Sequence, residues 1–204
     1  FGRLDVDGLP ARAALQLEHG RDVLNVRRIE QGAQGLSFTV CEGDSQHRLS
    51  TALIGHYNVA NLLGVMATLR ALGVPLAEVV AVCASLSPVP GRMQCLSAPN
   101  QPLAVVDYAH TPDALEKALH TLRQVTQQRG GQLWCVLGCG GDRDADKRQP
   151  MGEIAGAKAD VVIITSDNPR SESGAEIAAQ INAGVRASDS HKVLCTELDR
   201  RAAI

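Results

Sequence analysis

LWCVLGCGGDRD, residues 133–144, is the most informative stretch of this sequence. It joins five apolar residues, which have the length of a buried strand, to a glycine-rich loop that carries several charges. A helix is predicted at about 150–157 and a second apolar strand at 160–164. Apolar strands separated by a helix are typical of an α/β protein with a parallel sheet.

The alternation of strands and helices continues on both sides of this stretch. An apolar run at 103–106 predicts a strand, and a helix is expected to begin at Thr111 and Pro112, because threonine caps helices and proline suits their first turn. A further helix is predicted at 177–185 and a strand at 192–195. The second half is therefore predicted to be a mainly parallel sheet covered by helices on both faces, with right-handed crossovers.

The first half of the chain has a different pattern. Short β-prone runs at 22–26, 36–40 and 48–53 are separated by turn residues, and they predict an antiparallel meander. Apolar residues then recur at helical spacing over 58–72, and Gly73 is placed to end that helix. A second helix is expected to follow directly.

Both ends of the sequence are interpreted as lying inside a longer protein. The chain begins at Phe1 without an initiating methionine, and Asp199 is placed to cap a helix of only one turn at the other end. One isolated helical turn is not stable in water. The domain boundary is predicted after residue 95, which gives domains of 1–95 and 96–204.

Composition excludes several classes of protein. The 204 residues contain 20 Lys and Arg against 22 Asp and Glu, for a net charge of −2, and aromatic residues make up 2%. This charge balance excludes a strongly basic nucleic-acid binder, and the aromatic residues are too few for a base-stacking platform. No apolar run approaches the roughly 18 residues of a membrane helix. The six cysteines form no CxxC pair, which disfavours zinc and favours a reduced, cytoplasmic protein.

Three polar loops are predicted to follow strands of the second half, at 107–113, 138–144 and 166–172. Open α/β sheets bind ligands at the carboxyl ends of their strands, so these loops are candidates for a site. Arg143 and Arg170 lie in two of them and suit a carboxylate or a phosphate. Two simpler interpretations stay open: a tight turn with positive φ for the glycine-rich loop, and an Asx-type turn before Arg170.

Other polar residues have both a functional and a simpler interpretation. His110 suits a general base or a plain loop position, and Asp107 suits a ribose hydroxyl or a loop-ordering role. Asn58 and Asn61 lie near a helix N-terminus, where one of them can be a cap. Arg92, on the rigid turn between the halves, suits a nucleotide phosphate or a salt bridge equally well.

Five motifs occur in order along the chain, from about residue 50 onward. They are Gly55-His56-Tyr57-Asn58-Val59-Ala60-Asn61, Pro90-Gly91-Arg92-Met93, Asp107-Tyr108-Ala109-His110-Thr111-Pro112-Asp113, Gly138-Cys139-Gly140-Gly141-Asp142-Arg143-Asp144 and Asp167-Asn168-Pro169-Arg170. Together they closely resemble the Mur ligase family, in particular its members that add meso-diaminopimelate to a UDP-linked muramoyl dipeptide.

The resemblance implies a three-domain, ATP-dependent amide ligase. This chain would contain the tail of the central ATPase domain, with antiparallel strands and helices, followed by a truncated Rossmann-like C-terminal domain. ATP would phosphorylate the D-glutamyl γ-carboxylate, and the amine of the incoming amino acid would attack the acyl phosphate. The phosphate-binding loop, the Mg²⁺ ligands and the catalytic residues are expected outside these 204 residues, so no metal site is assigned within them.

The resemblance also implies roles for single residues. The ATP contacts would be Asn61, Arg92 and Asp107. The meso-diaminopimelate contacts would be Arg143, Asp167, Asn168, Pro169 and Arg170. The implied cofactors are ATP and Mg²⁺, and the implied partners are the UDP-linked muramoyl dipeptide and meso-diaminopimelate, with no nucleic acid and no membrane span. A cytoplasmic monomer is expected.

Alternatives remain within and outside the family. Lysine-adding ligases and folylpolyglutamate synthetases are the nearest relatives with other substrates, and a flavodoxin-like binding module without chemistry is the rival from another class. Arg170 argues against lysine, because meso-diaminopimelate differs from lysine by one carboxylate that needs a cation. The 204 residues alone are expected to be inactive.

Overall fold

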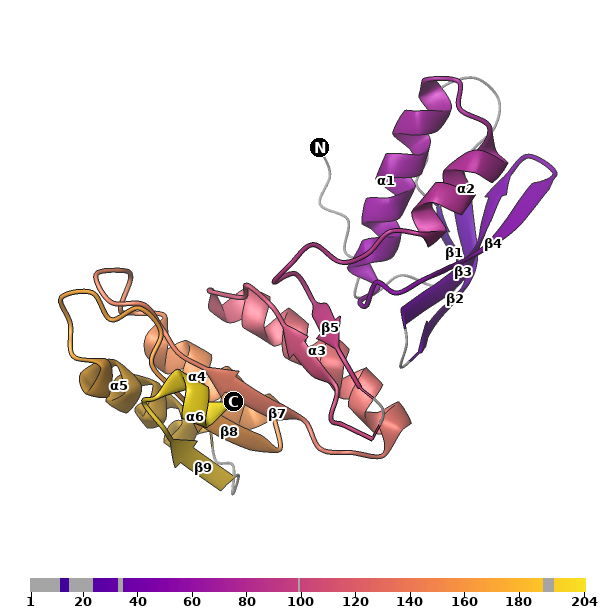
Figure 1. Cartoon of the computed structure of the whole chain (residues 1–204). Helices are drawn as coiled ribbons and strands as arrows, with labels where there is room; N and C mark the ends of the chain where they lie inside the picture. The colour runs from indigo at the N-terminus through magenta and orange to yellow at the C-terminus, as the bar shows by residue number, and fades with distance from the viewer. Residues whose placement is uncertain (1–11, 15–23, 33–34, 99, 189–192) are drawn as a thin grey trace. The chain divides into compact units, whose positions relative to one another are not determined.

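The structure is a computed structural model of the chain that describes residues 12–14, 24–32, 35–98, 100–188 and 193–204 (Figure 1). The described chain divides into two compact units, Phe1–Asp107 and Tyr108–Ile204. This division falls further along the chain than the boundary predicted after residue 95, and the assignment of the two domains stays a prediction. Each unit is described by itself below.

The first unit contains an antiparallel meander. Its strands are β1 (Arg12–Ala14), β2 (Asn25–Gly32), β3 (Gly35–Glu42) and β4 (Ser45–Thr51), paired in that order. The central strand β3 buries Leu36, Phe38 and Val40 on one face, as the two-residue period of a strand requires. The predicted meander is confirmed, although part of the run predicted at 22–26 lies outside the described residues.

Two helices cover the buried face of this sheet (Figure 1). Helix α1 (Tyr57–Ala71) buries Leu63 and Met66 against the strands, and α2 (Leu76–Ala84) adds Val79 and Cys83 to the same core. Gly73 follows α1 with a φ of 88°, a left-handed conformation that glycine adopts without strain. The predicted end of the helix is therefore confirmed.

A short strand pair completes the first unit. Strand β5 (Gln94–Leu96) pairs antiparallel with β6 (Ala104–Val106), and the two form a sheet of their own. The sequence predicts a strand at this position, but as a member of the parallel sheet. In the described chain that placement is wrong, because β6 pairs with β5 and the parallel sheet consists of β7, β8 and β9.

The second unit alternates strands and helices. Its strands β7 (Trp134–Leu137), β8 (Val161–Ile164) and β9 (Val193–Thr196) form a parallel sheet in that order. Its helices are α3 (Pro112–Arg129), α4 (Arg148–Lys158), α5 (Gly174–Ala187) and α6 (Arg200–Ala203). The predicted α/β fold with a parallel sheet is confirmed.

Local capping sets where these helices begin. The Thr111 hydroxyl accepts a hydrogen bond from the backbone N–H of Ala114 at 3.3 Å, and the Ser173 hydroxyl caps α5 in the same way. Asp199 caps α6 by accepting from the backbone N–H of Arg201 at 2.8 Å. Ser173 and Asp199 lie at the ends of the segments that follow β8 and β9 of the parallel sheet, so these two caps also position those segments.

One core joins the sheet to α3, α4 and α5. Cys135, Leu137, Val162 and Ile164 point from the strands into a buried cluster with apolar residues of all three helices. Trp134 and Val136 alternate to the other face of β7 and are 56% and 41% exposed. Within the described part of this unit, the predicted cover of helices is therefore wrong for one face of β7. A run of apolar residues does not reveal whether both faces of its strand are covered.

Candidate functional site

Two loops of the second unit lie against each other at the carboxyl edge of its sheet. They follow β7 and β8, which are parallel neighbours, so both loops leave the sheet at the same edge. The backbone N–H of Gly141 donates to the carbonyl of Asn168 at 2.9 Å. Asp142 accepts from Ser171 twice, from the hydroxyl at 2.6 Å and from the backbone N–H at 3.3 Å. We call residues 138–144 and 166–172 the paired loops.

The glycines of the first loop allow this close approach. A Cβ on Gly141 would lie 1.8 Å from the carbonyl oxygen of Pro169, and one on Gly138 would lie 2.4 Å from that of Thr165. Neither glycine has a positive φ. The positive φ predicted for this loop occurs at Asp142, with a φ of 50°, and not at its glycines, whose lack of side chains instead lets two backbones meet.

The left-handed conformations in the paired loops belong to Asp142 and Arg170, each with a φ of 50°. Arg170 donates from its backbone N–H to Asn168 Oδ1 at 3.3 Å, which is the predicted Asx-type turn, and its Nη1 donates to the carbonyl of Gly141. Arg143 lies exposed on the other loop and makes no hydrogen bond or ion pair with any described residue. The structure therefore places two guanidinium groups on adjacent loops.

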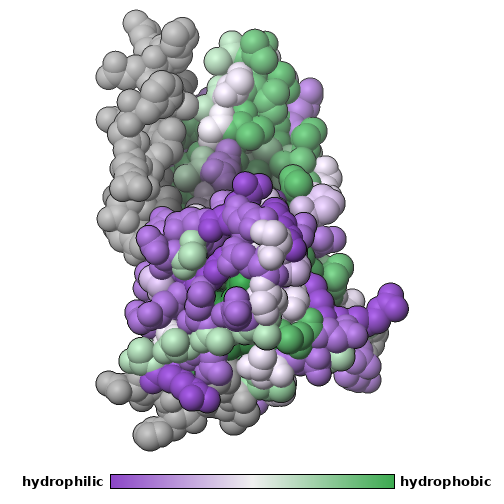
Figure 2. Space-filling view, turned by 90° about the vertical axis from the view of Figure 1, so that its left-hand side faces the viewer, coloured by the Kyte–Doolittle hydropathy of each residue, from purple (hydrophilic) through white to green (hydrophobic). Residues whose placement is uncertain are grey.

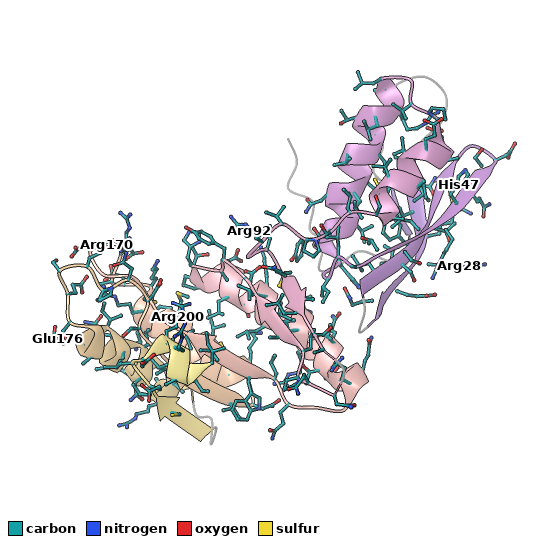
Figure 3. All side chains as sticks on the ribbon, in the orientation of Figure 1. Arg28, His47, Arg92, Arg170, Glu176 and Arg200 are labelled. Carbon is teal, nitrogen blue, oxygen red and sulfur yellow. The ribbon has the colours of Figure 1, made fainter. Side chains whose placement is uncertain are left out.

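Asp167 has a partner that the sequence did not suggest. Arg200, the first residue of α6, approaches it with Nη1 at 3.2 Å from Oδ1 and also donates to the carbonyl of Ser166 at 3.3 Å. Both side chains are about half exposed. Figure 3 labels Arg200 and Arg170 in this unit, and Figure 2 shows that the part of the unit nearest the viewer is mainly hydrophilic.

The position of Arg200 identifies the third loop of this edge. It follows β9, the third parallel strand, so this segment takes the place that the sequence assigned to 107–113. The signal was present in the sequence as an arginine directly after the predicted cap at Asp199. It was missed because the third loop of this edge was assigned to 107–113.

An ion pair between a buried arginine and a partly exposed glutamate joins the start of α4 to the second of the paired loops. Arg148, 1% exposed at the start of α4, donates from Nη1 and Nη2 to the two carboxylate oxygens of Glu172, each at 2.8 Å. Nη1 also donates to Gln180 Oε1 at 2.8 Å, and Glu172 Oε1 accepts from the backbone N–H of Asp142 at 2.6 Å. These hydrogen bonds lower the pKa of Glu172, with Arg148 as the main cause, and raise the pKa of Arg148.

Arg92 and Asp107 are brought together in the first unit. The Asp107 carboxylate accepts from the backbone N–H of Met93 at 2.9 Å, so it holds the residue next to Arg92. The turn is tight, with φ of 71° at Gly91 and 45° at Met93, and the Arg92 side chain is exposed on it. Asp107 is thus a loop-ordering residue in this structure.

Asn61, a predicted ATP contact, lies in the first turns of α1. Tyr57, one turn before Asn61, has a pKa raised to about 12, first by burial and then by the negative charge of Asp107. The amide of Asn61 donates to Asn58 Oδ1 at 3.1 Å, and that of Asn58 donates to the carbonyl of Ile54 at 2.8 Å. The N-cap residue His56 makes no side-chain cap bond, so the interpretation of an asparagine as the cap is wrong.

His110 lies in the second unit, just before α3. Its Nδ1 is 3.1 Å from the carbonyl of Tyr108, and the two rings meet edge to face at 5.2 Å between centroids. Lys147 donates from Nζ to the carbonyl of His110 at 2.9 Å. The loop that begins at Asp107 therefore reaches the start of α4, although its strand lies outside the parallel sheet.

The described residues contain neither a metal site nor a membrane-spanning helix. No three His, Cys, Asp or Glu side chains among them converge as a metal site. None of their helices is both long and apolar enough to cross a bilayer. All six cysteines lie in the described chain and are free thiols.

Comparison with known proteins places the chain in a family. The family described as "Mur ligase, glutamate ligase domain" matches residues 91–204. UDP-N-acetylmuramoyl-L-alanyl-D-glutamate–2,6-diaminopimelate ligase of Acidovorax sp. (strain JS42) is 55% identical over 181 residues, which are 89% of this chain and 36% of that protein. The ligase of the same name from Chromobacterium violaceum is 45% identical over 206 residues, covering 100% of this chain and 41% of that protein.

Solved structures agree on the fold. A structure of a UDP-N-acetylmuramoyl-L-alanyl-D-glutamate–2,6-diaminopimelate ligase matches with a TM-score of 0.62 and 36% identity, over 88% of this chain and 36% of its own. A Mycobacterium tuberculosis folylpolyglutamate synthase complexed with ADP matches with a TM-score of 0.65 at 21% identity, over 87% of this chain and 38% of its own. This chain spans little more than a third of the length of most of these proteins, and it belongs to the Mur ligase family.

Proposed function

We propose that this chain is part of an ATP-dependent ligase that adds meso-diaminopimelate to UDP-N-acetylmuramoyl-L-alanyl-D-glutamate in peptidoglycan precursor synthesis. The observation that carries the proposal is the pair of guanidinium groups, Arg143 and Arg170, on the paired loops at the carboxyl edge of the parallel sheet. The relatives named for this reaction support it, since they share up to 55% of aligned residues with the chain.

The chemistry requires an activated carboxylate. A carboxylate is a poor acyl donor until one of its oxygens becomes a leaving group, and transfer of the γ-phosphoryl group of ATP to the D-glutamyl γ-carboxylate achieves this. The amine of the second substrate then attacks the acyl carbon, forms the amide bond and loses a proton, while phosphate leaves with the bonding electron pair. Catalysis of such a step rests mostly on positioning and on neutralisation of charge.

Asn61, Arg92 and Asp107 are proposed as the ATP contacts of this chain. Arg92 is exposed, and its guanidinium suits a phosphate, while Asp107 holds the turn that presents Arg92 and is proposed to contact a ribose hydroxyl. Mg²⁺ would neutralise the phosphates when bound. We assign its ligands, the phosphate-binding loop and the catalytic residues to parts of the ligase other than these 204 residues.

The paired loops are proposed as the meso-diaminopimelate site. A planar guanidinium binds a carboxylate through two parallel hydrogen bonds, so Arg170 and Arg143 can each hold one carboxylate of the substrate. Asp167 suits an amine, because its carboxylate is negatively charged and already pairs with one cation, Arg200, and Asn168 offers an amide. Pro169 keeps the turn rigid, so that Arg170 projects from a defined backbone.

Substitution of Arg170 tests the proposal. In a ligase of the relatives' length that carries this sequence, Arg170→Ala should raise the KM for meso-diaminopimelate tenfold or more, because loss of a charge-paired contact costs roughly 2–5 kcal/mol. The KM for ATP should change by less than about twofold. Arg170→Lys keeps the charge without the planar fork, so it should fall between the wild type and Arg170→Ala.

The competing substrate provides the decisive control. Wild-type ligase should use meso-diaminopimelate and reject L-lysine, which lacks the carboxylate that the arginine would hold. Turnover with L-lysine equal to that with meso-diaminopimelate, or an unchanged KM in Arg170→Ala, would refute the assignment. We further propose that the ligase acts in the cytoplasm and that it is a monomer. Sedimentation of the purified protein would check the oligomeric state.

A further inference from the structure

The pair of Arg148, which is buried, and Glu172, whose side chain is 33% exposed, is poorly suited to a purely stabilising role. Arg148 is 1% exposed, and its Nε has no hydrogen-bond partner in the described chain. Removing a guanidinium from water is costly, and an unpaired buried N–H adds to that cost. Apolar residues of similar volume often replace buried ion pairs without loss of stability. The pair therefore calls for an explanation other than fold stability.

The hydrogen bonds of Glu172 show what the pair holds. One carboxylate oxygen accepts from both Arg148 Nη2 and the backbone N–H of Asp142, and the other accepts from Arg148 Nη1. Asp142 directly precedes Arg143, and Glu172 lies two residues after Arg170. One carboxylate thus joins the backbone of the first paired loop to the second paired loop.

The conformation at Asp142 needs such support. Its φ of 50° lies in the left-handed region, which costs a non-glycine residue of order 1 kcal/mol or more. With its N–H held by Glu172, the Asp142 carboxylate accepts from Ser171, which directly follows Arg170. The backbone before Arg143 is therefore held by the Glu172 carboxylate, which Arg148 orients, and the backbone after Arg170 is held by the Asp142 carboxylate.

We infer that Arg148 and Glu172 are positioning residues that set the spacing of Arg143 and Arg170 for the two carboxylates of the amino-acid substrate. This inference rests on the proposed function. Arg148 does not reach the substrate, since it is buried. The two Nη groups of Arg148 hold the Glu172 carboxylate in the orientation that links the paired loops. The guanidinium groups of Arg143 and Arg170 are thereby in place before the substrate binds.

The chain contains a matched control for this pair. Arg123 binds Asp160 in the same forked manner, with Nη1 at 2.7 Å from Oδ2 and Nη2 at 3.0 Å from Oδ1. Asp160 also accepts from the backbone N–H of Leu133, just before β7, so this pair lies at the amino edge of the sheet. Arg123→Met removes an arginine–carboxylate pair of the same unit without touching the paired loops.

The experiment compares Arg148→Met, Arg148→Lys and Arg123→Met in a ligase of the relatives' length that carries this sequence. Methionine keeps the volume of the arginine stem, and lysine keeps only the charge. We expect Arg148→Met to raise the KM for meso-diaminopimelate at least tenfold, with the KM for ATP within twofold and a melting temperature close to that of Arg123→Met. Arg148→Lys should recover part of the lost affinity, and Arg123→Met should leave both KM values unchanged.

Three outcomes would overturn the inference. Unchanged kinetics in Arg148→Met would do so, as would equal increases in the KM for both substrates, or an Arg123→Met variant with the same kinetic defect. If Arg148→Met does not fold, Glu172→Gln is the deciding variant. Glutamine keeps an acceptor for the backbone N–H of Asp142, but it lacks the negative charge that pairs with the Arg148 guanidinium. It should show the same selective rise in KM, and normal kinetics would refute the inference.

The design separates this inference from the proposed function. Wild-type ligase without turnover dependent on meso-diaminopimelate overturns the proposed function and this inference with it. Wild-type ligase with that turnover, together with unaffected Arg148→Met and Glu172→Gln variants, overturns this inference alone.

Discussion

Arg170 combines a left-handed backbone with a side chain that lies over the neighbouring loop. Asp142 has the same φ and lies opposite it in the paired loops. Conformations of this kind persist only where surrounding contacts hold them, and they are concentrated at binding and catalytic sites. At the scale of single residues, the paired loops therefore have the properties of a preformed site.

Tyr57 allows a direct test of the contacts among Tyr57, Asp107 and the Arg92 turn. Burial and the charge of Asp107 raise its pKa from 10.0 to about 12, so the folded chain keeps the phenol protonated at pH values where the unfolded chain loses the proton. The resulting stabilisation is complete below pH 10 and is lost as the pH rises through about 12. Titration of tyrosinate absorbance should show this late transition, and Tyr57→Phe should remove it.

Asp107→Asn is the companion variant for this titration. It should lower the pKa of Tyr57 without restoring the ordinary value, because burial is the larger cause. An unchanged Tyr57 transition in Asp107→Asn would mean that the carboxylate does not face the tyrosine, and it would remove the structural link between the start of α1 and the Arg92 turn.

At the scale of elements, two glycines let α4 and α5 pack closely. A Cβ on Gly152 would lie 2.1 Å from the carbonyl oxygen of Ile181, and one on Gly184 would lie 2.0 Å from that of Gln149. In both cases the added Cβ would meet a backbone carbonyl oxygen of the other helix, and backbone atoms cannot move aside as the end of a flexible side chain can. Because Arg148 begins α4 and binds Gln180 of α5, this packing also fixes the base of the paired loops.

Gly184→Ala should destabilise the second unit by about 1–3 kcal/mol through overpacking, despite the roughly 1 kcal/mol that alanine gains in helix propensity. Urea denaturation followed by the fluorescence of Trp134, the single tryptophan, reports on this unit. Gly131→Ala is the control, since no heavy atom lies within 4 Å of its added Cβ, and it should shift stability by less than about 0.5 kcal/mol. Equal midpoints for the two variants would contradict the packing argument.

At the scale of the whole molecule, the chain spans little more than a third of the length of several of its relatives. We predict that a polypeptide of these 204 residues does not catalyse ligation. Its sequence contains no Gly-x4-Gly-Lys-Ser/Thr loop to hold the transferred phosphoryl group, and phosphoryl transfer depends on such a cradle. Phosphate release from ATP above background, dependent on both other substrates, would contradict this prediction.

Features with local causes could be predicted from the sequence. The start of α3 at Thr111, the end of α1 before Gly73 and the cap of α6 at Asp199 all depend on residues within one helical turn. The alternation of apolar runs and helices was enough to predict the parallel sheet. The arginines of the paired loops were likewise identified from their place after predicted strands, because parallel strands end at a common edge.

Only the tertiary structure decided which groups meet across distance in the chain. Arg148 and Glu172 are 24 residues apart, and nothing near either residue in the sequence identifies the other as its partner. The same holds for Asp167 with Arg200, for the pairing of β6 with β5, and for the exposed face of β7. The physical reason is that hydrogen bonds within a helix or a cap are set by neighbouring residues, whereas the partner of a strand edge or a buried charge is set by the packing of the whole unit.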